Sequence, residues 1–328
     1  MINYMKKNAK IYVAGHKGLV GSSIVRLLNK LGYSNILTKS HDELNLENQA
    51  AVNSFFKQEK PEFVFLAAAK VGGIVANNTY PADFGYQNQA IGLNVIHAAY
   101  KNNVKRLMFL GSSCLFPREC PQPMKEEHLL TGPLEPTNKA YALAKIAGIS
   151  LCESYNKQYG TQYMVAMPTN LYGPNDNYDL NASHVIPALM RKIHEAKISG
   201  SKSVEVWGSG VALREFMHSD DLADALVFLF NLPEKDYQSL LDSKVSGPVV
   251  NIGYGKDISI KELVELLQNI IGFSGTINWD TSKPDGTPKK LLCCNKIHSV
   301  GWKAKREFKQ ELSKIYNDKF LSAMALEA

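Results

Sequence analysis

The fold is decided by the stretch Ile11-Tyr12-Val13-Ala14-Gly15-His16-Lys17-Gly18-Leu19-Val20-Gly21. Its apolar start runs into a glycine-rich turn, and apolar residues then recur at helical spacing from Ser22 to Leu31. This order predicts a strand, a tight turn and a helix. Glycines in such a turn let backbone amides and the helix N-terminus approach a pyrophosphate. The alternative to a nucleotide site is a plain turn whose glycines only allow the helix and strand to pack closely. In this context we interpret the turn as a nucleotide-binding site.

Strands and helices alternate along the first half of the chain. Short apolar runs predict the strands, and residues at helical spacing predict the helices between them. The predicted strands are 35–38, 63–68, 106–110 and 163–167, and the predicted helices are 48–58, 83–102 and 141–159. Strands that alternate with helices pair in parallel through right-handed crossovers. We therefore expect an α/β fold with a doubly wound parallel sheet of the Rossmann type.

The alternation stops at a polar loop that runs from Gly173 to Asn181. Beyond the loop, the patterns predict helices at 184–197, 219–231, 259–271 and 305–325 and strands at 204–207 and 248–252. We expect a nucleotide-binding domain over 1–175, to which segments near 211–255 return. A smaller, discontinuous mixed α/β domain takes most of 176–328, and the substrate is expected in the cleft between the two domains.

Composition excludes several classes of protein. The 328 residues are 45% hydrophobic and 21% charged, which suits a soluble chain with a sizeable core and excludes a disordered one. The net charge of +6 is spread without a basic block, so no nucleic-acid partner is expected. No apolar run reaches the ~18 residues of a membrane span, and the start lacks an apolar signal segment. The five cysteines form no C-x-x-C pair, so we expect a cytoplasmic protein without a metal site.

The residues after the second predicted strand bear on the choice of cofactor. An enzyme that prefers NAD carries Asp or Glu there, about 20 residues on, to bind the ribose 2′-hydroxyl. This chain has Thr38-Lys39-Ser40-His41 instead, and Lys17 adds a cation in the glycine turn. Cations at this place favour the 2′-phosphate of NADP(H), and the alternative is lysines that are simply solvated on a loop.

Tyr141 and Lys145 place a phenol and an ammonium four residues apart on one face of a predicted helix. A lysine there lowers the pKa of a tyrosine from its reference value of about 10 and makes the phenol a usable acid or base. The alternative is a half-buried tyrosine beside a solvated lysine. Gly111-Ser112-Ser113-Cys114 follows the fourth predicted strand, at the carboxyl edge where doubly wound sheets bind ligands. Its hydroxyls and thiol can face the phenol.

Taken together, these motifs resemble those of a known family. The glycine turn, the Gly111-Ser112-Ser113 strand end and the Tyr141/Lys145 pair are similar to the extended short-chain dehydrogenase/reductases that act on nucleotide sugars. Longer stretches, from about residue 10 to 320, resemble the GDP-L-fucose synthase branch. They include Ala67-Ala68-Ala69-Lys70-Val71-Gly72-Gly73-Ile74-Val75-Ala76-Asn77-Asn78, Met167-Pro168-Thr169-Asn170-Leu171-Tyr172-Gly173-Pro174, Val206-Trp207-Gly208-Ser209-Gly210 and Lys283-Pro284-Asp285-Gly286-Thr287-Pro288.

The resemblance implies a reaction in two stages on GDP-4-keto-6-deoxy-D-mannose. C3 and C5 are first epimerised, and NADPH then reduces the C4 ketone to give GDP-L-fucose. Both carbons are α to the ketone, so an acid and a base on opposite faces invert each through an enolate. The acid–base pair corresponds to Cys114 and His184, and which of them is the base at each centre stays open. Tyr141 corresponds to the proton donor for C4, Lys145 tunes it and binds the nicotinamide ribose, and Ser112 binds the sugar oxygen.

The resemblance also implies which residues bind the cofactor and the sugar nucleotide. The cofactor residues are Gly15, His16, Lys17, Gly18, Leu19, Val20, Gly21, Lys39, His41, Leu110, Gly111, Ser112, Ser113, Lys145, Pro168, Thr169, Asn170, Leu171 and His184. The substrate residues are Lys192, Trp207, Arg214 and Asp285. The planar fork of an arginine suits a diphosphate. Each of these residues also has a purely structural alternative. Trp207 could be a core residue and Arg214 a surface residue, Cys114 could pack as a small hydrophobe, and His184 could cap a helix.

The sequence also departs from the family pattern. Lys17 and His41 stand where relatives carry arginines for the 2′-phosphate, and Lys192 stands where an arginine often contacts the substrate. These departures weaken the preference for NADP(H) more than any other expectation.

Two other functions stay open at this point: a nucleotide-sugar epimerase that retains NAD(P), and a non-catalytic NADP-binding partner protein. The resemblance also implies a homodimer, because relatives pair through a four-helix seam at helices 83–102 and 142–159. The alternative is that the apolar residues of these helices pack only inward.

Overall fold

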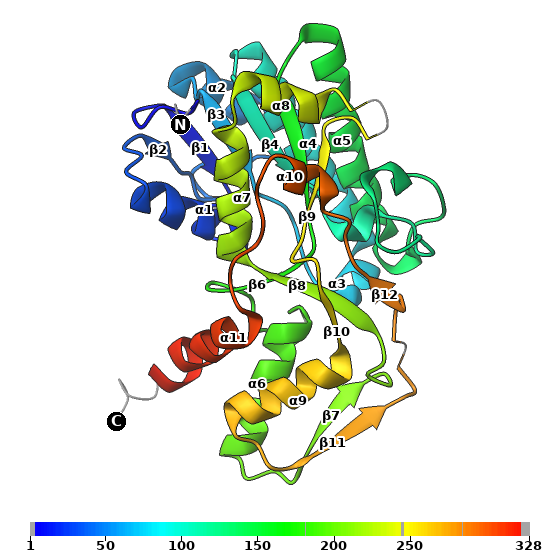
Figure 1. The fold of residues 1–328 in the computed structure, drawn as a ribbon. Helices are drawn as coiled ribbons and strands as arrows, with labels where there is room; N and C mark the ends of the chain where they lie inside the picture. The colour runs from blue at the N-terminus through cyan, green and yellow to red at the C-terminus, as the bar shows by residue number, and fades with distance from the viewer. Residues whose placement is uncertain (1–3, 181, 244–245, 284, 323–328) are drawn as a thin grey trace.

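The computed structural model describes residues 4–180, 182–243, 246–283 and 285–322 (Figure 1). Asn181 of the polar loop, Pro284 of one family-like stretch and the last residues of the predicted terminal helix lie outside these ranges. The described part confirms the predicted α/β fold with a doubly wound parallel sheet.

The main sheet consists, within the described ranges, of six strands in the order β2-β1-β3-β4-β5-β9. All neighbouring strands in it run parallel. The strands are β1 (Ile11–Ala14), β2 (Ile36–Leu37), β3 (Phe63–Leu66), β4 (Arg106–Leu110), β5 (Tyr163–Pro168) and β9 (Val249–Ile252). Because the strands are parallel, their carboxyl ends meet at one edge of the sheet, and the loops that follow them lie together there.

Helices cover the main sheet, whose central strands are buried along their whole length, as their unbroken apolar runs predict. The helix α1 packs against α7, and α4 packs against both α2 and α5. These helices are α1 (Leu19–Lys30), α2 (Gln49–Glu59), α4 (Pro81–Lys101), α5 (Lys139–Tyr159) and α7 (Ser219–Phe230). Two shorter helices, α8 (Glu234–Leu241) and α10 (Asn295–Ser299), contact β9.

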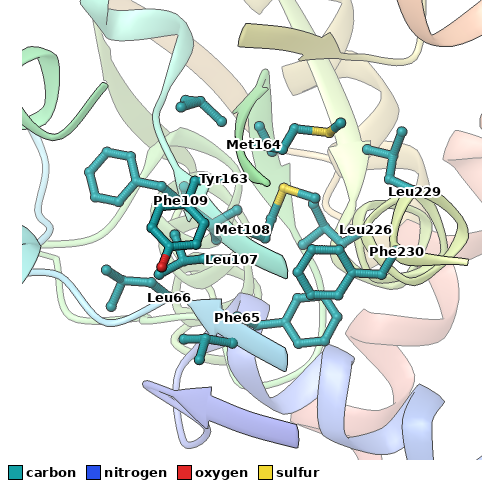
Figure 2. Packing of buried hydrophobic residues seen from close by; sticks show 14 of the residues in the cluster. Phe65, Leu66, Leu107, Met108, Phe109, Tyr163, Met164, Leu226, Leu229 and Phe230 are labelled. Atoms are coloured by element: carbon teal, nitrogen blue, oxygen red, sulfur yellow. The ribbon is translucent and has the colours of Figure 1, made fainter. Parts of the chain in front are cut away.

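The helix α7 belongs to this first core although it lies far along the chain. Figure 2 shows its residues Leu226 and Phe230 beside Phe65 of β3, and the rings of Phe65 and Phe230 lie 4.4 Å apart between centroids. Neighbouring residues of a strand point to opposite faces. On the other face, the ring of Phe109 in β4 lies against Gly148 of α5, where an added Cβ would collide with it.

A second group of strands begins at the carboxyl edge of the main sheet. After β5 a single residue, Thr169, leads into β6 (Asn170–Tyr172), which pairs with β8 (Leu213–His218). The strand β8 also pairs with β10 (Asp257–Ser259) and β12 (Lys289–Lys290), and β7 (Ser203–Trp207) pairs with β11 (Thr276–Asp280). The helices of this region are α6 (Val185–Ile198), α9 (Ile260–Ile271) and α11 (Phe308–Tyr316).

Several elements were not predicted from the sequence. They are β6, β8, β10, β11, β12, α8, α10 and the short helix α3 (Ile74–Thr79), besides single turns at Ser113–Leu115, Glu126–His128 and Pro136–Asn138. The predicted terminal helix over 305–325 begins only at Phe308, because the Glu307 side chain caps it by accepting a hydrogen bond from the Gln310 amide at 2.9 Å. A π-helical turn, Asn317–Leu321, follows α11.

Buried apolar side chains of the described residues form two clusters. The first holds the main sheet together with α7, α8 and residues around Leu292 to Trp302. The second lies between α6, α9 and α11 and includes Val204 and Phe216. In the part of the chain that the structure describes, no helix has the length and apolar character to cross a membrane.

Candidate functional site

The glycine turn after β1 has the shape of an anion-binding loop. Gly15 has φ +80°, and a Cβ on it would lie 2.7 Å from the backbone nitrogen of Ala68. A Cβ on Gly21 would collide with the carbonyl oxygen of Gly15, so the turn closes tightly only with glycine at both places. Gly18 caps the start of α1, whose first amides have no partner within the helix and therefore favour a phosphate. The buried Nδ1 of His16 has no hydrogen-bond partner among the described residues, which leaves it available to a ligand.

The loop that follows β2 carries a carboxylate whose ion pair the sequence did not indicate. Glu43 lies 3.6 Å from the ammonium of Lys39 and accepts hydrogen bonds from the amide and hydroxyl of Ser40 at 2.8 and 2.7 Å. The Ser40 amide, with the Ser40 hydroxyl second, lowers the pKa of Glu43 to about 2. Lys39 is therefore ion-paired rather than a free cation, whereas Lys17 and His41 are exposed.

Lys145 lies at the carboxyl end of β4. It is 3% exposed and donates a hydrogen bond to the carbonyl of Leu110 at 2.9 Å, with its ammonium 4.7 Å from the centre of the Phe109 ring. Burial lowers the pKa of Lys145 to about 8. Gly148, one turn further along α5, lets the helix approach β4 closely enough for this hydrogen bond.

Tyr141 is half-buried on α5, and its pKa is shifted in the direction opposite to the one expected from the sequence. Burial raises its pKa, and the charge of Cys114 raises it further. The sequence led us to expect that Lys145 lowers this pKa. The direction is opposite because the phenolate loses its hydration in the protein, while the ammonium of Lys145 is directed at the Leu110 carbonyl.

Ser112 and Cys114 lie in the loop that follows β4. The Ser112 hydroxyl accepts a hydrogen bond from the Cys114 amide at 3.2 Å and so begins the turn Ser113–Leu115. The half-buried Cys114 also contacts a residue that sequence reasoning missed, because the ammonium of Lys290 lies 3.7 Å from its Sγ. Lys290 belongs to β12, directly after the family-like stretch 283–288, and it pairs in register with Arg214 of β8.

The structure brings Arg214 and Asp285, two of the predicted substrate residues, into contact. One amino group of the Arg214 guanidinium donates to the carbonyl of Asp285 at 3.2 Å, and the other donates to the carbonyl of Leu213 at 2.8 Å. The Asp285 carboxylate accepts hydrogen bonds from the amide and hydroxyl of Ser209 at 2.7 and 2.8 Å. The Ser209 amide, as the largest cause, lowers the pKa of Asp285.

Trp207 presents an exposed indole next to this pair of residues. It is 52% exposed, and the ammonium groups of Lys192 and Lys283 each lie 5.6 Å from the centre of its ring. A Cβ on Gly208, which follows it, would collide with the carboxylate of Asp285, so glycine is needed there. The four predicted substrate residues thus form one positively charged, partly aromatic surface beside β8.

His184 is at the N-terminal end of α6, but its side chain does not cap the helix. His184 is exposed, and partial desolvation by the neighbouring protein atoms lowers its pKa. Among the described residues no hydrogen bond or ion pair joins it to Cys114. Leu110, Gly111 and Ser113 lie at the end of β4 and directly after it. Pro168, Thr169, Asn170 and Leu171 lie at the junction of β5 and β6, where Thr169 and Asn170 both donate to the carbonyl of Glu215, at 3.1 and 2.9 Å.

Comparison with known proteins decides the family. Residues 11–253 match the sequence model of the NAD dependent epimerase/dehydratase family. The chain belongs to this family. It is also 55% identical over 311 residues to GDP-L-fucose synthase 1 of Arabidopsis thaliana, covering 95% of this chain and 93% of that one.

Solved structures of related proteins agree with this placement in the epimerase/dehydratase family. A GDP-6-OMe-4-keto-L-xylo-heptose reductase from C. jejuni has a TM-score of 0.90 at 42% identity, covering 97% of this chain and 99% of that one. A GDP-L-fucose synthetase from Naegleria fowleri bound to NADP has a TM-score of 0.85 at 26% identity, covering 98% and 96% of the two chains. The resemblance to the GDP-L-fucose synthases that the motifs indicate is confirmed.

Proposed function

We propose that this protein is a GDP-L-fucose synthase, which epimerises C3 and C5 of GDP-4-keto-6-deoxy-D-mannose and then reduces C4 with NADPH. The observation that carries the proposal is the common location of Cys114, Arg214 and Tyr141. Lys290, whose ammonium lies 3.7 Å from the Cys114 Sγ, pairs in register with Arg214, and Cys114 also interacts electrostatically with Tyr141. A proton-exchanging thiol, a phenol and a diphosphate-binding guanidinium are the groups that this reaction needs in one place.

The residues of the first core fit NADP(H). The glycine turn and the N-terminus of α1 bind the pyrophosphate, and the unpartnered Nδ1 of His16 lies in the same turn. Lys17 and His41 bind the 2′-phosphate, and Lys145 binds the nicotinamide ribose. When bound, NADPH supplies the hydride for the reduction of C4.

Proton exchange at C3 and C5 falls to Cys114 and His184. One of them removes the proton from one face of the sugar, and the other returns a proton to the opposite face. Between these events the negative charge lies on the C4 oxygen, where the hydroxyls of Ser112 and Tyr141 donate hydrogen bonds to it. The lowered pKa of His184 leaves its imidazole neutral at physiological pH, so it is free to accept a proton.

Reduction at C4 requires a proton for the developing alkoxide, and Tyr141 donates it. A donor has to remain protonated until the hydride arrives, and the burial that raises the Tyr141 pKa ensures this. Lys145, one helical turn further along α5, has a pKa of about 8 and so stays cationic near neutral pH, where its ammonium binds the nicotinamide ribose rather than lowering the Tyr141 pKa.

The GDP moiety binds on the positively charged surface beside β8. The exposed indole of Trp207 offers a flat apolar face to the base, and Arg214 and Lys192 bind the diphosphate. Asp285, which also contacts Arg214, orients that arginine and accepts hydrogen bonds from the nucleoside.

We extend the proposal to domains, assembly and compartment. The two apolar clusters support a cofactor domain over 1–175 with returning segments near 211–255, against which residues around Leu292 to Trp302 also pack, and a substrate domain over most of the rest of 176–328. Tyr86 and Leu93 of α4 and Leu143 of α5 are 69%, 46% and 45% exposed, which supports a homodimer that buries them. All five cysteines are free thiols, which supports the cytoplasm.

The deciding experiment incubates the purified protein with GDP-4-keto-6-deoxy-D-mannose and NADPH and identifies the product by mass spectrometry and NMR. GDP-L-fucose with stoichiometric loss of NADPH supports the proposal. The likeness to a heptose reductase makes simple C4 reduction the second candidate, and it would give a reduced sugar with C3 and C5 unchanged. An inverted sugar without loss of NADPH would indicate an epimerase that retains its cofactor, and no reaction would indicate a binding protein.

A further inference from the structure

The contact between Lys290 and Cys114 joins two residues that are distant in sequence. The Lys290 ammonium lies 3.7 Å from the Cys114 Sγ, and both side chains are half-buried. Lys290 has no carboxylate within ion-pair distance among the described residues, whereas the neighbouring Lys289 pairs with Asp257 at 3.1 Å. Successive residues of a strand point to opposite faces, so Lys289 is directed away from the thiol.

The backbone around Lys290 is held on both sides. Through β12 it pairs with β8, and the next two amides, of Leu291 and Leu292, donate to the side chains of Gln122 and Glu215 at 2.9 Å each. The carbonyl of Leu291 accepts from the Met124 amide at 2.7 Å. These bonds tie β12 both to β8 and to the loop that follows Cys114, so the lysine is fixed relative to the thiol.

Three charged or titratable groups act on Cys114. Lys290 faces it from β12, and the charges of Cys114 and of Arg214 on β8 attract each other. Tyr141 of α5 interacts electrostatically with it, and this interaction disfavours two anions side by side. The guanidinium of Arg214 is committed to two backbone carbonyls, whereas Lys290 directs its ammonium at the sulfur itself. Lys290 is therefore the cation in contact with the thiol.

We propose that Lys290 is a positioning residue that stabilises the thiolate form of Cys114 during epimerisation, an inference that rests on the proposed function. A cysteine that acts as a base starts as the thiolate and takes the proton from carbon, and one that acts as an acid ends as the thiolate after giving its proton to carbon. In neither direction does Lys290 itself exchange a proton with the sugar. An opposite charge at this distance lowers the free energy of the thiolate in either case.

The test measures the thiolate directly and needs no substrate. The full-length protein and the variants Lys290→Met, Lys290→Arg and Lys289→Met are treated with iodoacetamide at a series of pH values. Cys114 is followed by mass spectrometry, because tryptic cleavage after Arg106 and Arg118 separates it from the other cysteines. Circular dichroism and thermal unfolding check that each variant is folded.

In Lys290→Met, alkylation of Cys114 should require a pH higher by about one to two units, so that its rate near neutral pH falls about 10- to 100-fold. Lys290→Arg retains a cation and should follow the parent, as should the matched control Lys289→Met. An unchanged profile in Lys290→Met, or an equal shift in Lys289→Met, would overturn the proposal. If Lys290→Met does not fold, Lys290→Gln replaces it with the same expected shift.

A second measurement links the thiolate to the reaction. Deuterium uptake from D₂O at C3 and C5 of the 4-keto substrate should fall about 10- to 100-fold in Lys290→Met near neutral pH and recover as the pH is raised. Uptake that is equally low at every pH would mean that Lys290 acts otherwise than through the charge on Cys114. If the parent protein itself exchanges no deuterium, the proposed function fails, whereas the alkylation profile still decides the role of Lys290.

Discussion

Replacing Tyr141 with phenylalanine should separate the two stages of the reaction. The change removes one hydroxyl and keeps the ring, and the hydroxyl makes no hydrogen bond to any described residue. No partner is left unsatisfied, so the free energy of unfolding should change by less than about 1 kcal/mol. A large loss of activity in this variant would therefore come from the missing hydroxyl in the reaction and not from unfolding.

The size of that loss follows from the role of the hydroxyl. Tyr141 is protonated at neutral pH because burial and the charge of Cys114 raise its pKa, so the parent protein has the donor fully available. Losing one positioned proton donor costs about 10² to 10⁴ in rate, which corresponds to about 3 to 5.5 kcal/mol in the barrier. NADPH oxidation should fall by this factor, whereas proton exchange at C3 and C5 should continue, because Ser112 still donates a hydrogen bond to the C4 oxygen.

The assay pairs single-turnover NADPH oxidation with NMR of substrate recovered from D₂O. Phenylalanine at position 141 should leave deuterium uptake at C3 and C5 within about tenfold of the parent while reduction is nearly lost. The reasoning is refuted if exchange and reduction disappear together in a variant that folds and binds NADPH. Tyr141 would then polarise the ketone for both stages.

Three further predictions concern other residues of the site. Lys145 loses its proton as the pH rises through about 8, so the rate of C4 reduction should decline above that pH. Stopped-flow measurement of NADPH oxidation gives this rate, and a rate that stays constant up to about pH 9.5 would contradict the prediction. Cys114→Ser removes the thiolate and should yield a reduced but non-inverted GDP-6-deoxyhexose, whereas GDP-L-fucose formed at the parental rate would assign the thiol to packing alone. NADPH should be preferred over NADH in kcat/KM. Glu43→Gln, which releases Lys39 from its ion pair, should increase the ratio of the kcat/KM for NADPH to that for NADH by about 5- to 10-fold, and an unchanged ratio would mean that Lys39 does not face the 2′-phosphate.

The first core could be predicted from the sequence because its strands are apolar on both faces and its helices have clear periodicity. The strand β8 escaped prediction because Arg214 and Glu215 interrupt its apolar pattern. Glu215 is nevertheless fully buried, since its carboxylate accepts hydrogen bonds from the amides of Gly255 and Leu292 at 2.7 and 2.9 Å. These partners lie far along the chain, and no local pattern contains them.

The same limit applies to the site. Motifs indicated Tyr141, Lys145 and Cys114, because each follows a predicted strand or lies on a predicted helix face. Lys290 belongs to a Lys-Lys dipeptide, which is typical of a solvated loop, and only the pairing of β12 with β8 brings it to the thiol. The direction of the Tyr141 pKa was likewise beyond the sequence, because it depends on how completely the folded chain removes water from the phenol.

The return of the chain to the first core has a consequence for synthesis on the ribosome. When β5 has emerged, its neighbour β9 and the covering helix α7 have still to be made. Until then β5 is an open edge with unpaired backbone groups, and the Phe65 face of the sheet lacks the side chains of α7. The nascent chain therefore carries an exposed, aggregation-prone surface for as long as the segment between β5 and β9 is being translated. A chaperone that binds extended apolar segments should associate with ribosomes stalled within this interval and dissociate once β9 is released.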